Sequence, residues 1–597
     1  MQHKSENLVQ VKSLGVAVAL ASYAFALGGA EIARAAGEYP QRAGDVVSFQ
    51  PFREESPEVT LAQGGRAQLI NLNKYVGTSF LLRVQGAPGL PASNSAGGAV
   101  YHLEKAATIK LNDVKVSLVP EGLLVTEGTQ KSICQFAAPG SALAQANRKA
   151  PYVAICGSTI FVRHQASGAS GGLFSWGADV LRSISPEAET VIQAVKEGRE
   201  DKDRIAGAEL DRKSAPVGSS PDRPKRAQIA SNLQDRVMSV PYEIEVAEAR
   251  SSGEPLLTGE WYSAKNAKPG IYFSVMYPNH VAPELLKTYT DRVDALDSVE
   301  AQSAAYLVAF DLSKFEVGWQ SGTDMPEAGW SSEPMTQALR AGDTMAGPDG
   351  FGSFSPLARP GVVNPSLLPR LAGVMCGGFQ RKHGVFKDGP MSKANFGNYW
   401  GFIENGVLMS RLNPGLATFA VDVNGQIKFK TWQDSDNAAP SLATIRHARQ
   451  NGVPLIDGID GKGISIPGQY VSIARTGRAG AWSGSASGET RSPRSAMCIS
   501  TQNGRQYLIY GYFSSAKPTA IVRVFQSQHC DYAMHLDMNS PQQAYFGLVT
   551  SNGGSFDTEN PAPGMSNVTG SFQGKKAELP RYVGQPDKSD AFYFLAK

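Results

Sequence analysis

The sequence predicts an α+β fold in which a large domain with a mixed or antiparallel sheet follows a smaller strand-rich module. Three observations support this prediction. The 597 residues include 62 glycines and 36 prolines, a turn-rich composition that suits short strands better than a helical bundle. Several segments alternate apolar and polar residues with a period of two, and Asn-Gly pairs between such segments predict hairpins. Helical signals lie between strands in the second half of the chain.

The overall composition limits the class of protein. Hydrophobic residues make up 42% and charged residues 19%, which is enough for packed cores and excludes a wholly disordered chain. A net charge of +3 gives no electrostatic reason to expect nucleic acid as the main partner. The length predicts more than one domain.

The N-terminus has the pattern of a secretory signal peptide over residues 1–35. Lys4 and Lys12 precede an uncharged stretch that is most apolar between Leu14 and Leu27, and Ala33 and Ala35 follow with A-x-A spacing. The alternative is an uncleaved anchor, but the apolar part is shorter than the roughly 20 residues that a spanning helix needs. We therefore expect an exported protein, periplasmic or extracellular, without a transmembrane segment after cleavage.

Residues 40–165 form the predicted strand-rich module. Residues 114–119 alternate with a period of two, and residues 152–156 and 159–163 form a hairpin pattern around Gly157-Ser158. Residues 166–228 are predicted to hold a helix near 185–196 and then a polar linker rich in charge, Pro and Ser.

Five cysteines are too few for a disulfide scaffold, but export would allow disulfides to form. Cys134 and Cys156 lie close in sequence, and Cys498 and Cys530 flank one supersecondary unit. These positions favour two pairs and a free Cys376. The alternative is that all five are buried as small apolar residues.

Residues 229–597 form the predicted large domain. A helix beginning near Pro283 separates strand patterns at 271–275 and 305–310. Further expected elements are a hairpin of 416–423 and 426–430 around Asn424-Gly425, a hairpin of 496–499 and 506–510 around Asn503-Gly504, an amphipathic helix at 518–528 and a strand at 532–536. Asn-Gly at both hairpins predicts a type I′ turn with two positive φ angles.

Two segments of this domain concentrate residues that carry chemistry. A strand at 374–379 contains Gly377 and Gly378, which let a ligand approach backbone amides closely. The apolar strand in segment 532–539 is expected to place His535 and Asp537 on one face, because alternate residues of a strand point the same way. Each signal has a purely structural alternative: a turn for the glycines and a capping residue for the aspartate.

Between residues 300 and 550 the sequence has four motifs in order: CGGFQ at 376–380, QNGVPLI at 450–456, RSA at 494–496 and AMHLDMNS at 533–540. In this order they resemble the phosphodiester glycosidase domain family. The corresponding family motifs are an N-G-G-F-F strand, a Q-x-x-P-L-[IV] segment, an R-[ST]-A strand and an A-[ML]-N-L-D-G-G-G-S segment. Cys376 and His535 replace family asparagines, and Met538 and Asn539 replace glycines.

The resemblance implies an exported hydrolase that removes a sugar similar to N-acetylglucosamine from a sugar-1-phosphodiester in the cell envelope. It makes Asp537 the base or cation-stabilising carboxylate, Arg494 the phosphate clamp and His535 a proton carrier or a partner that orients Asp537. The expected substrate-binding residues are Arg494, Cys376, Gly377, Gly378 and Asn539. Because the glycines after Asp537 are replaced, the alternative is a catalytically impaired protein that binds glycan or envelope polysaccharide on the same fold.

No cofactor is required by these motifs. A divalent cation such as calcium, held by oxygen ligands, is one open possibility. A site formed by His535 and Asp537 with His383 or His447 is another, although no zinc spacing is present. The sequence does not indicate an oligomeric state.

Overall fold

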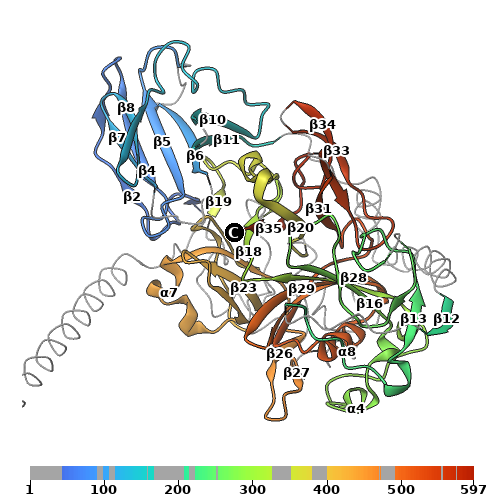
Figure 1. The fold of residues 1–597 in the computed structure, drawn as a ribbon. Helices are drawn as coiled ribbons and strands as arrows, with labels where there is room; N and C mark the ends of the chain where they lie inside the picture. Colours follow the sequence, from blue (N-terminus) through green and yellow to red (C-terminus); the bar gives the residue numbers. More distant parts are fainter. Residues whose placement is uncertain are drawn as a thin grey trace, which may run out of the picture.

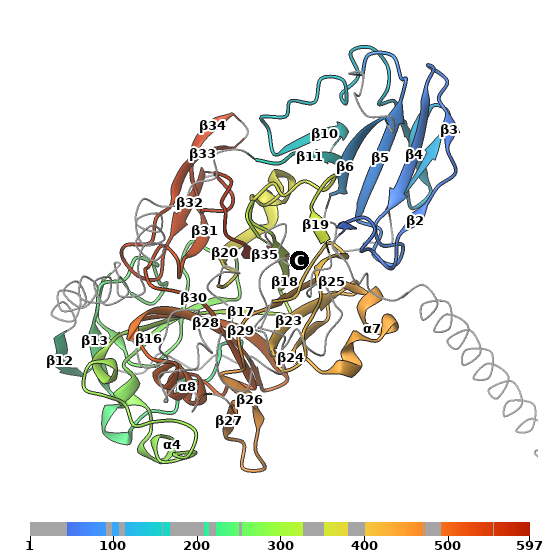
Figure 2. The ribbon, with the colours of Figure 1, turned by 180° about the vertical axis from the view of Figure 1, so that it is seen from behind.

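A computed structural model describes residues 44–90, 98–106, 114–157, 159–166, 208–213, 222–249, 253–325, 351–379, 400–469, 471, 491–552, 555–572 and 574–597. The expected signal peptide (1–35) and the helix expected near 185–196 lie outside these residues. Figures 1 and 2 show the N-terminal strands at one end of the molecule and a large sheet with α8 at the other end. Among the described residues, no helix combines the length and the apolar character needed to cross a membrane.

Two small antiparallel sheets form the N-terminal part. One has the order β10-β11-β6-β5-β4-β2, with β3 also paired to β4, and the other has the order β7-β8-β9. The strand predicted at 114–119 and the hairpin predicted at 152–163 are confirmed. The strands are β2 (Glu54–Glu55), β3 (Val59–Thr60), β4 (Arg66–Asn71), β5 (Ser79–Gln85), β6 (Ala99–Lys105), β7 (Val114–Val119), β8 (Gly122–Glu127), β9 (Gln130–Cys134), β10 (Tyr152–Cys156) and β11 (Ile160–Arg163).

The larger N-terminal sheet is buried on both faces. Leu69 and Leu82 belong to a core shared with the small sheet. Ile70 and Leu81, their neighbours along the strands, belong to the main core of the molecule. Since alternate residues of a strand point to opposite faces, this sheet joins the two cores.

Three sheets pack around the main core. The first, of eight strands, has the order β15-β16-β17-β29-β28-β30-β26-β27, the second β18-β35-β20-β31-β32 and the third β22-β21-β25-β23-β24. Phe310 of the first sheet stacks on Phe594 of the second, and Trp319 of the second stacks on Phe402 of the third. In the first sheet the strands are β15 (Tyr262–Ser263), β16 (Ile271–Met276), β17 (Ala305–Asp311), β26 (Ile456–Ile459), β27 (Ser465–Pro467), β28 (Ser492–Gln502), β29 (Arg505–Ala516) and β30 (Tyr532–Met538). In the second they are β18 (Phe315–Gln320), β20 (Leu371–Cys376), β31 (Phe546–Asn552), β32 (Ser555–Glu559) and β35 (Ala591–Ala596), and in the third β21 (Phe402–Glu404), β22 (Val407–Ser410), β23 (Ala417–Asp422), β24 (Ile427–Thr431) and β25 (Ile445–Gln450).

Short sheets complete the fold. The segment 208–213, which was expected to lie in a polar linker, forms strand β12 instead and pairs with β13. Charged residues are well tolerated in an edge strand, so the charge of this segment does not exclude pairing. The strands are β12 (Ala208–Lys213), β13 (Arg236–Ser239), β14 (Leu256–Leu257), β33 (Val568–Phe572), β34 (Lys575–Leu579) and the parallel pair β1 (Gly44–Asp45) and β19 (Phe351–Ser353).

Helices play a smaller part than the α+β prediction implies. The described α-helices are α4 (Pro283–Leu286), α7 (Ala439–Ala443) and α8 (Pro518–Ser527), so the antiparallel sheets are confirmed but strands dominate the fold. The helix predicted at 518–528 is present, yet all of its residues are buried. It packs against β29 on one side and α4 on another, and Arg523 donates to the carbonyls of Leu285 and Thr288 at 2.9 Å each.

The two Asn-Gly hairpins differ. Asn503 and Gly504 both have positive φ angles, 52° and 75°, which confirms the type I′ prediction. At the other hairpin only Gly425 has a positive φ. There the Asp422 carboxylate accepts hydrogen bonds from the amides of Asn424 and Gln426 at 2.8 and 2.9 Å, and this local capping favours a different turn.

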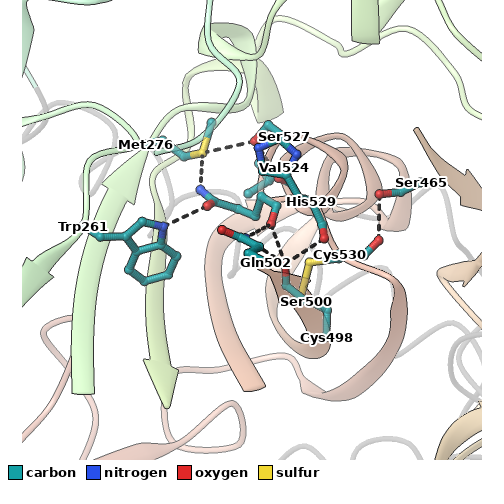
Figure 3. The surroundings of a disulfide bond; sticks show 11 residues. Trp261, Met276, Ser465, Cys498, Ser500, Gln502, Val524, Ser527, His529 and Cys530 are labelled. Atoms are coloured by element: carbon teal, nitrogen blue, oxygen red, sulfur yellow. Dashed lines mark hydrogen bonds between the residues drawn. A yellow bond between two sulfur atoms is a disulfide. The ribbon is translucent and has the colours of Figure 1, made fainter. Parts of the chain in front are cut away.

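Both predicted disulfides are present, and Cys376 is free and buried. Cys134–Cys156 links β9 to β10, and Cys498–Cys530 links β28 to the segment that follows α8. Figure 3 shows the second bond beside a polar cluster, in which Ser500 Oγ donates to the carbonyl of His529 at 2.7 Å and Ser465 Oγ to that of Cys530 at 2.7 Å.

Removing the second disulfide should measurably destabilise the protein. We expect the Cys498→Ala/Cys530→Ala double variant to lose about 2–4 kcal/mol of unfolding free energy, because the bond closes a loop of the unfolded chain. Denaturant unfolding measures this loss. A reducing agent should lower the midpoint of the wild type more than that of the double variant, and equal shifts would contradict the prediction.

Candidate functional site

The two segments predicted to carry chemistry do converge. Cys376, at the end of β20, places its Sγ 3.2 Å from Ser495 Oγ on β28, and Ser495 Oγ donates to the carbonyl of Asp537 at 2.8 Å. The ends of β20 and β30 therefore meet, although they belong to different sheets.

Asn451 joins these two segments and was not among the residues predicted from the sequence. Its Oδ1 accepts from the amide of Phe379 at 3.1 Å, and its Nδ2 donates to the carbonyls of His535 and Leu536 at 2.5 and 3.2 Å. The only sequence signal for this role was the position of Asn451 within the QNGVPLI segment.

A β-bulge separates residues that were expected to act together. In the pairing of β28 with β30, Arg494 lies opposite Met538 and Ala496 lies opposite His535, so β30 has one extra residue between them. Arg494 Nη1 contacts both His535 Nε2 at 3.2 Å and Met538 Sδ at 3.1 Å. Asp537 instead acts electrostatically on Cys376 and is itself affected by Asp590, Arg449 and Arg581. The expectation that His535 and Asp537 share a face therefore fails, because a bulge interrupts the alternation.

Arg494 and His535 form a buried pair on the side away from Asp537. Both are fully buried, and Arg494 Nε donates to the carbonyl of Ala516 at 2.8 Å. Burial lowers the pKa of Arg494 to about 9 and, together with the Arg494 charge, holds the pKa of His535 well below its usual value. The neutral His535 ring stacks on Phe379 with centroids 4.9 Å apart, and its Nδ1 lies 2.7 Å from the carbonyl of Leu536. This geometry does not place Arg494 as a phosphate clamp beside Asp537.

Asp537 is buried, and its carboxyl group is only partly hydrogen-bonded among the described residues. It is 8% exposed, and its Oδ1 accepts from the amide of Met538 at 2.9 Å. Its Oδ2 has no hydrogen-bond partner among the described residues. Burial is the largest cause that raises the pKa of Asp537 to about 8, and the Asp590 charge adds to it, against the effects of the Met538 amide, Arg449 and Arg581. The group is therefore a neutral acid at pH 7.

A buried ion pair lies beside this acid. Arg449 Nε and Nη2 donate to the two oxygens of Asp590 at 2.8 and 3.2 Å, and Trp319 Nε1 also donates to Asp590, at 2.7 Å. The other Arg449 donors reach Asn451 and the carbonyls of Gln450 and Phe379. Sequence reasoning missed Arg449 and Asp590, which have no motif around them other than the neighbouring Gln450.

The paired glycines make room for this ion pair. A Cβ on Gly377 would lie 1.9 Å from Asp590 Oδ2, and a Cβ on Gly378 would lie 2.8 Å from Asn451 Cγ. Gly378 also has a φ of +146°. The amide of Gly377 donates to the carbonyl of Asp590 at 2.8 Å, so it is not available to a ligand as expected, whereas the amide of Gly378 has no partner among the described residues.

The remaining predicted residues have structural contacts. Burial raises the pKa of the Cys376 thiol to about 12, so the thiol is neutral and a poor nucleophile. Asn539 has a φ of +87°, and its amide donates to the carbonyl of Pro493 at 2.8 Å, which ties the end of β30 to β28. No group of three potential metal-ligating side chains occurs within the described ranges. His447 lies on β25 and its Nδ1 accepts from the amide of Asn405 at 3.5 Å, while His383 lies outside the described residues.

The matches found among known proteins are structural and distant. No family model matches the sequence, and no curated protein matches it. The catalytic domain of zebrafish N-acetylglucosamine-1-phosphodiester alpha-N-acetylglucosaminidase, auto-inhibited by its pro-peptide, matches 65% of this chain and 100% of its own at 13% identity and a TM-score of 0.28. A Burkholderia pseudomallei protein named as a candidate exported protein matches 51% of this chain and 76% of its own at 11% identity and a TM-score of 0.18.

Proposed function

We propose that this protein is an exported hydrolase that releases a sugar similar to N-acetylglucosamine from a sugar-1-phosphodiester. One observation carries the proposal. Asp537 lies near the end of β30, is 8% exposed and has one carboxyl oxygen without a partner among the described residues, and burial raises its pKa to about 8. Support also comes from the motif order that resembles phosphodiester glycosidases and from two disulfides, which are typical of proteins outside the cytoplasm.

A neutral Asp537 suits a phosphodiester substrate better than an ionised Asp537 does. A carboxylate would repel the phosphate, whereas a carboxylic acid can donate a proton to the bridging oxygen as it leaves. In this reaction the bond between the anomeric carbon and the bridging oxygen breaks. The oxygen keeps the electron pair and takes the proton from Asp537. Water adds to the anomeric carbon, and its proton restores the acid.

The rate of hydrolysis should therefore fall as the pH rises. Because Asp537 loses its proton with a pKa of about 8, we expect kcat to fall as pH rises above 8, by about tenfold per pH unit. Rates with an aryl phosphodiester of N-acetylglucosamine measured from pH 6 to pH 10 test this. A rate that rises through pH 8 would show that Asp537 acts in its ionised form.

The pH dependence of the unfolding free energy gives an independent measure of the protonation of Asp537. An unfolded aspartate titrates near a pKa of about 3.9, so between about pH 4 and pH 8 the folded protein binds more protons than the unfolded chain. The contribution of Asp537 to stability is therefore present at low pH and is lost as pH rises to 8. Asp537→Asn should lack this part of the pH dependence.

The packing around Met538 favours a second candidate function. Met538, which replaces a family glycine, is buried and contacts Arg494. Met538 therefore packs against the Arg494–His535 pair of β28 and β30 and fills the space beside it. A protein that binds glycan without hydrolysing it is consistent with this. Incubation of the purified protein with sugar phosphodiesters separates the two functions: release of free sugar supports the hydrolase, and saturable binding without release supports the binder.

A further inference from the structure

The proposed function requires a cation for the substrate's phosphate, and Arg494 does not supply it. Two guanidinium groups, those of Arg449 and Arg581, act electrostatically on Asp537. The packing also places Arg581 near it: Arg581 lies over the ring of Tyr545, whose carbonyl accepts from the amide of Cys376 at 2.9 Å. Cys376 in turn contacts the Ser495 hydroxyl that donates to the carbonyl of Asp537. Arg449 is fully buried, and all five of its N–H groups are used by Asp590, Asn451, Phe379 and Gln450. Arg449 therefore has no donor left for a ligand.

Arg581 differs from Arg449 in two ways: its side chain is partly exposed, and not all of its N–H groups have partners among the described residues. Its side chain is 14% exposed, and its Nη2 donates to Asp587 Oδ2 at 2.7 Å. Its Nη1 donates to the carbonyl of Gln542. These contacts occupy two of the five N–H groups, and the side chain has no other acceptor among the described residues.

Arg581 is also held in a fixed orientation. Its guanidinium lies over the rings of Tyr545 and Tyr582, 5.4 and 5.2 Å from their centroids. Its backbone amide donates to Tyr545 OH at 3.1 Å. The ring contacts and the hydrogen bonds to Asp587 and Gln542 hold the guanidinium in place, and a planar guanidinium matches the spacing of two phosphate oxygens.

We propose that Arg581 binds the phosphate of the substrate, with Asp587 and the two tyrosines as positioning residues. This inference rests on the proposed function, since it assigns the anion subsite next to Asp537. The ligand class that it names is a sugar 1-phosphate or its diester. A neutral sugar would not use this contact.

The test compares a phosphorylated and a neutral ligand by calorimetry on the full chain. We expect wild-type protein to bind N-acetylglucosamine-1-phosphate, and Arg581→Gln to bind it at least about tenfold more weakly, as for loss of a charge-assisted hydrogen bond. Binding of N-acetylglucosamine should change little. Arg581→Lys keeps the charge but loses the planar fork, so it should be intermediate, and it serves as the folded variant if Arg581→Gln does not fold.

Arg370 provides a matched control, because it also pairs with one carboxylate, Glu316, at 3.2 Å and has a side chain that is 28% exposed. Arg370→Gln should leave binding of the phosphorylated sugar unchanged. The inference is overturned if wild-type protein does not bind N-acetylglucosamine-1-phosphate, or if folded Arg581 variants bind it as tightly as wild type. Binding that depends on Arg581 without any hydrolysis would support the subsite and contradict the hydrolase, so the two proposals can fail separately.

Discussion

Asp537→Asn should abolish hydrolysis of an aryl or alkyl phosphodiester of N-acetylglucosamine. The amide has nearly the same shape as the acid but cannot transfer a proton, and loss of a general acid lowers kcat by about 10²–10⁴-fold. Because Asp537 is neutral at pH 7, the substitution adds no buried charge and removes none. We therefore expect a folded variant with a low kcat and a KM close to that of wild type.

Asp457 offers a control on the neighbouring strand β26. It is exposed, and its Oδ1 accepts from Thr431 Oγ1 at 2.8 Å. Asp457→Asn should keep wild-type kcat. If folded Asp537→Asn hydrolysed the substrate at the wild-type rate, Asp537 would have no part in the chemistry and the hydrolase proposal would lose its main support.

Local sequence patterns predicted many of the strands and the disulfide pairs. The type I′ hairpin at Asn503-Gly504 follows from two residues that tolerate positive φ, and it fixes the register of β28 and β29. The helix at 518–528 follows from Pro518 at its first turn, but its complete burial does not, because that depends on α4 and β29 from other parts of the chain.

The candidate site was less predictable, for a physical reason. Strand alternation predicts that His535 and Asp537 share a face, but one extra residue in β30 interrupts the alternation between them. A bulge of this kind depends on the partner strand and has no signal in the residues of β30 alone. The charges that do act on Asp537 come from Arg449, Arg581 and Asp590, which are distant in sequence and meet only after the sheets pack.

A second cluster of buried charges, remote in sequence from Asp537, joins the N-terminal sheet to the third sheet. Arg163 on β11 donates from Nη1 to Glu104 Oε2 at 3.1 Å and from Nη2 to Glu404 Oε1 at 2.8 Å. Gln320 Nε2 and Ser321 Oγ also donate to Glu404, at 2.7 and 2.6 Å. All three charged side chains are almost fully buried, with exposed fractions of 2%, 5% and 2% for Arg163, Glu104 and Glu404.

Arg163→Met should destabilise the protein more than any surface substitution. The variant leaves Glu104 and Glu404 buried without their shared cation, and breaking a buried pair in this way costs about 3–5 kcal/mol. Burial already raises the pKa of Glu104 in the wild type, and the Arg163 charge opposes that rise. Chemical unfolding at pH 7 measures the loss, and Arg148→Met, at an exposed position, is the control.

The pH dependence of the stability lost in Arg163→Met identifies the cause of that loss. Without Arg163, the pKa of Glu104 in the folded variant should rise further above its unfolded value, so the folded variant binds more protons and gains stability as pH falls. The difference from wild type should therefore shrink between pH 7 and pH 5. Glu104→Gln/Arg163→Met/Glu404→Gln, which removes all three charges, should recover most of the stability at pH 7, because no buried charge is left unpaired. A loss that stayed the same at both pH values and in the triple variant would instead identify packing of the Arg163 stem as the source of the stability.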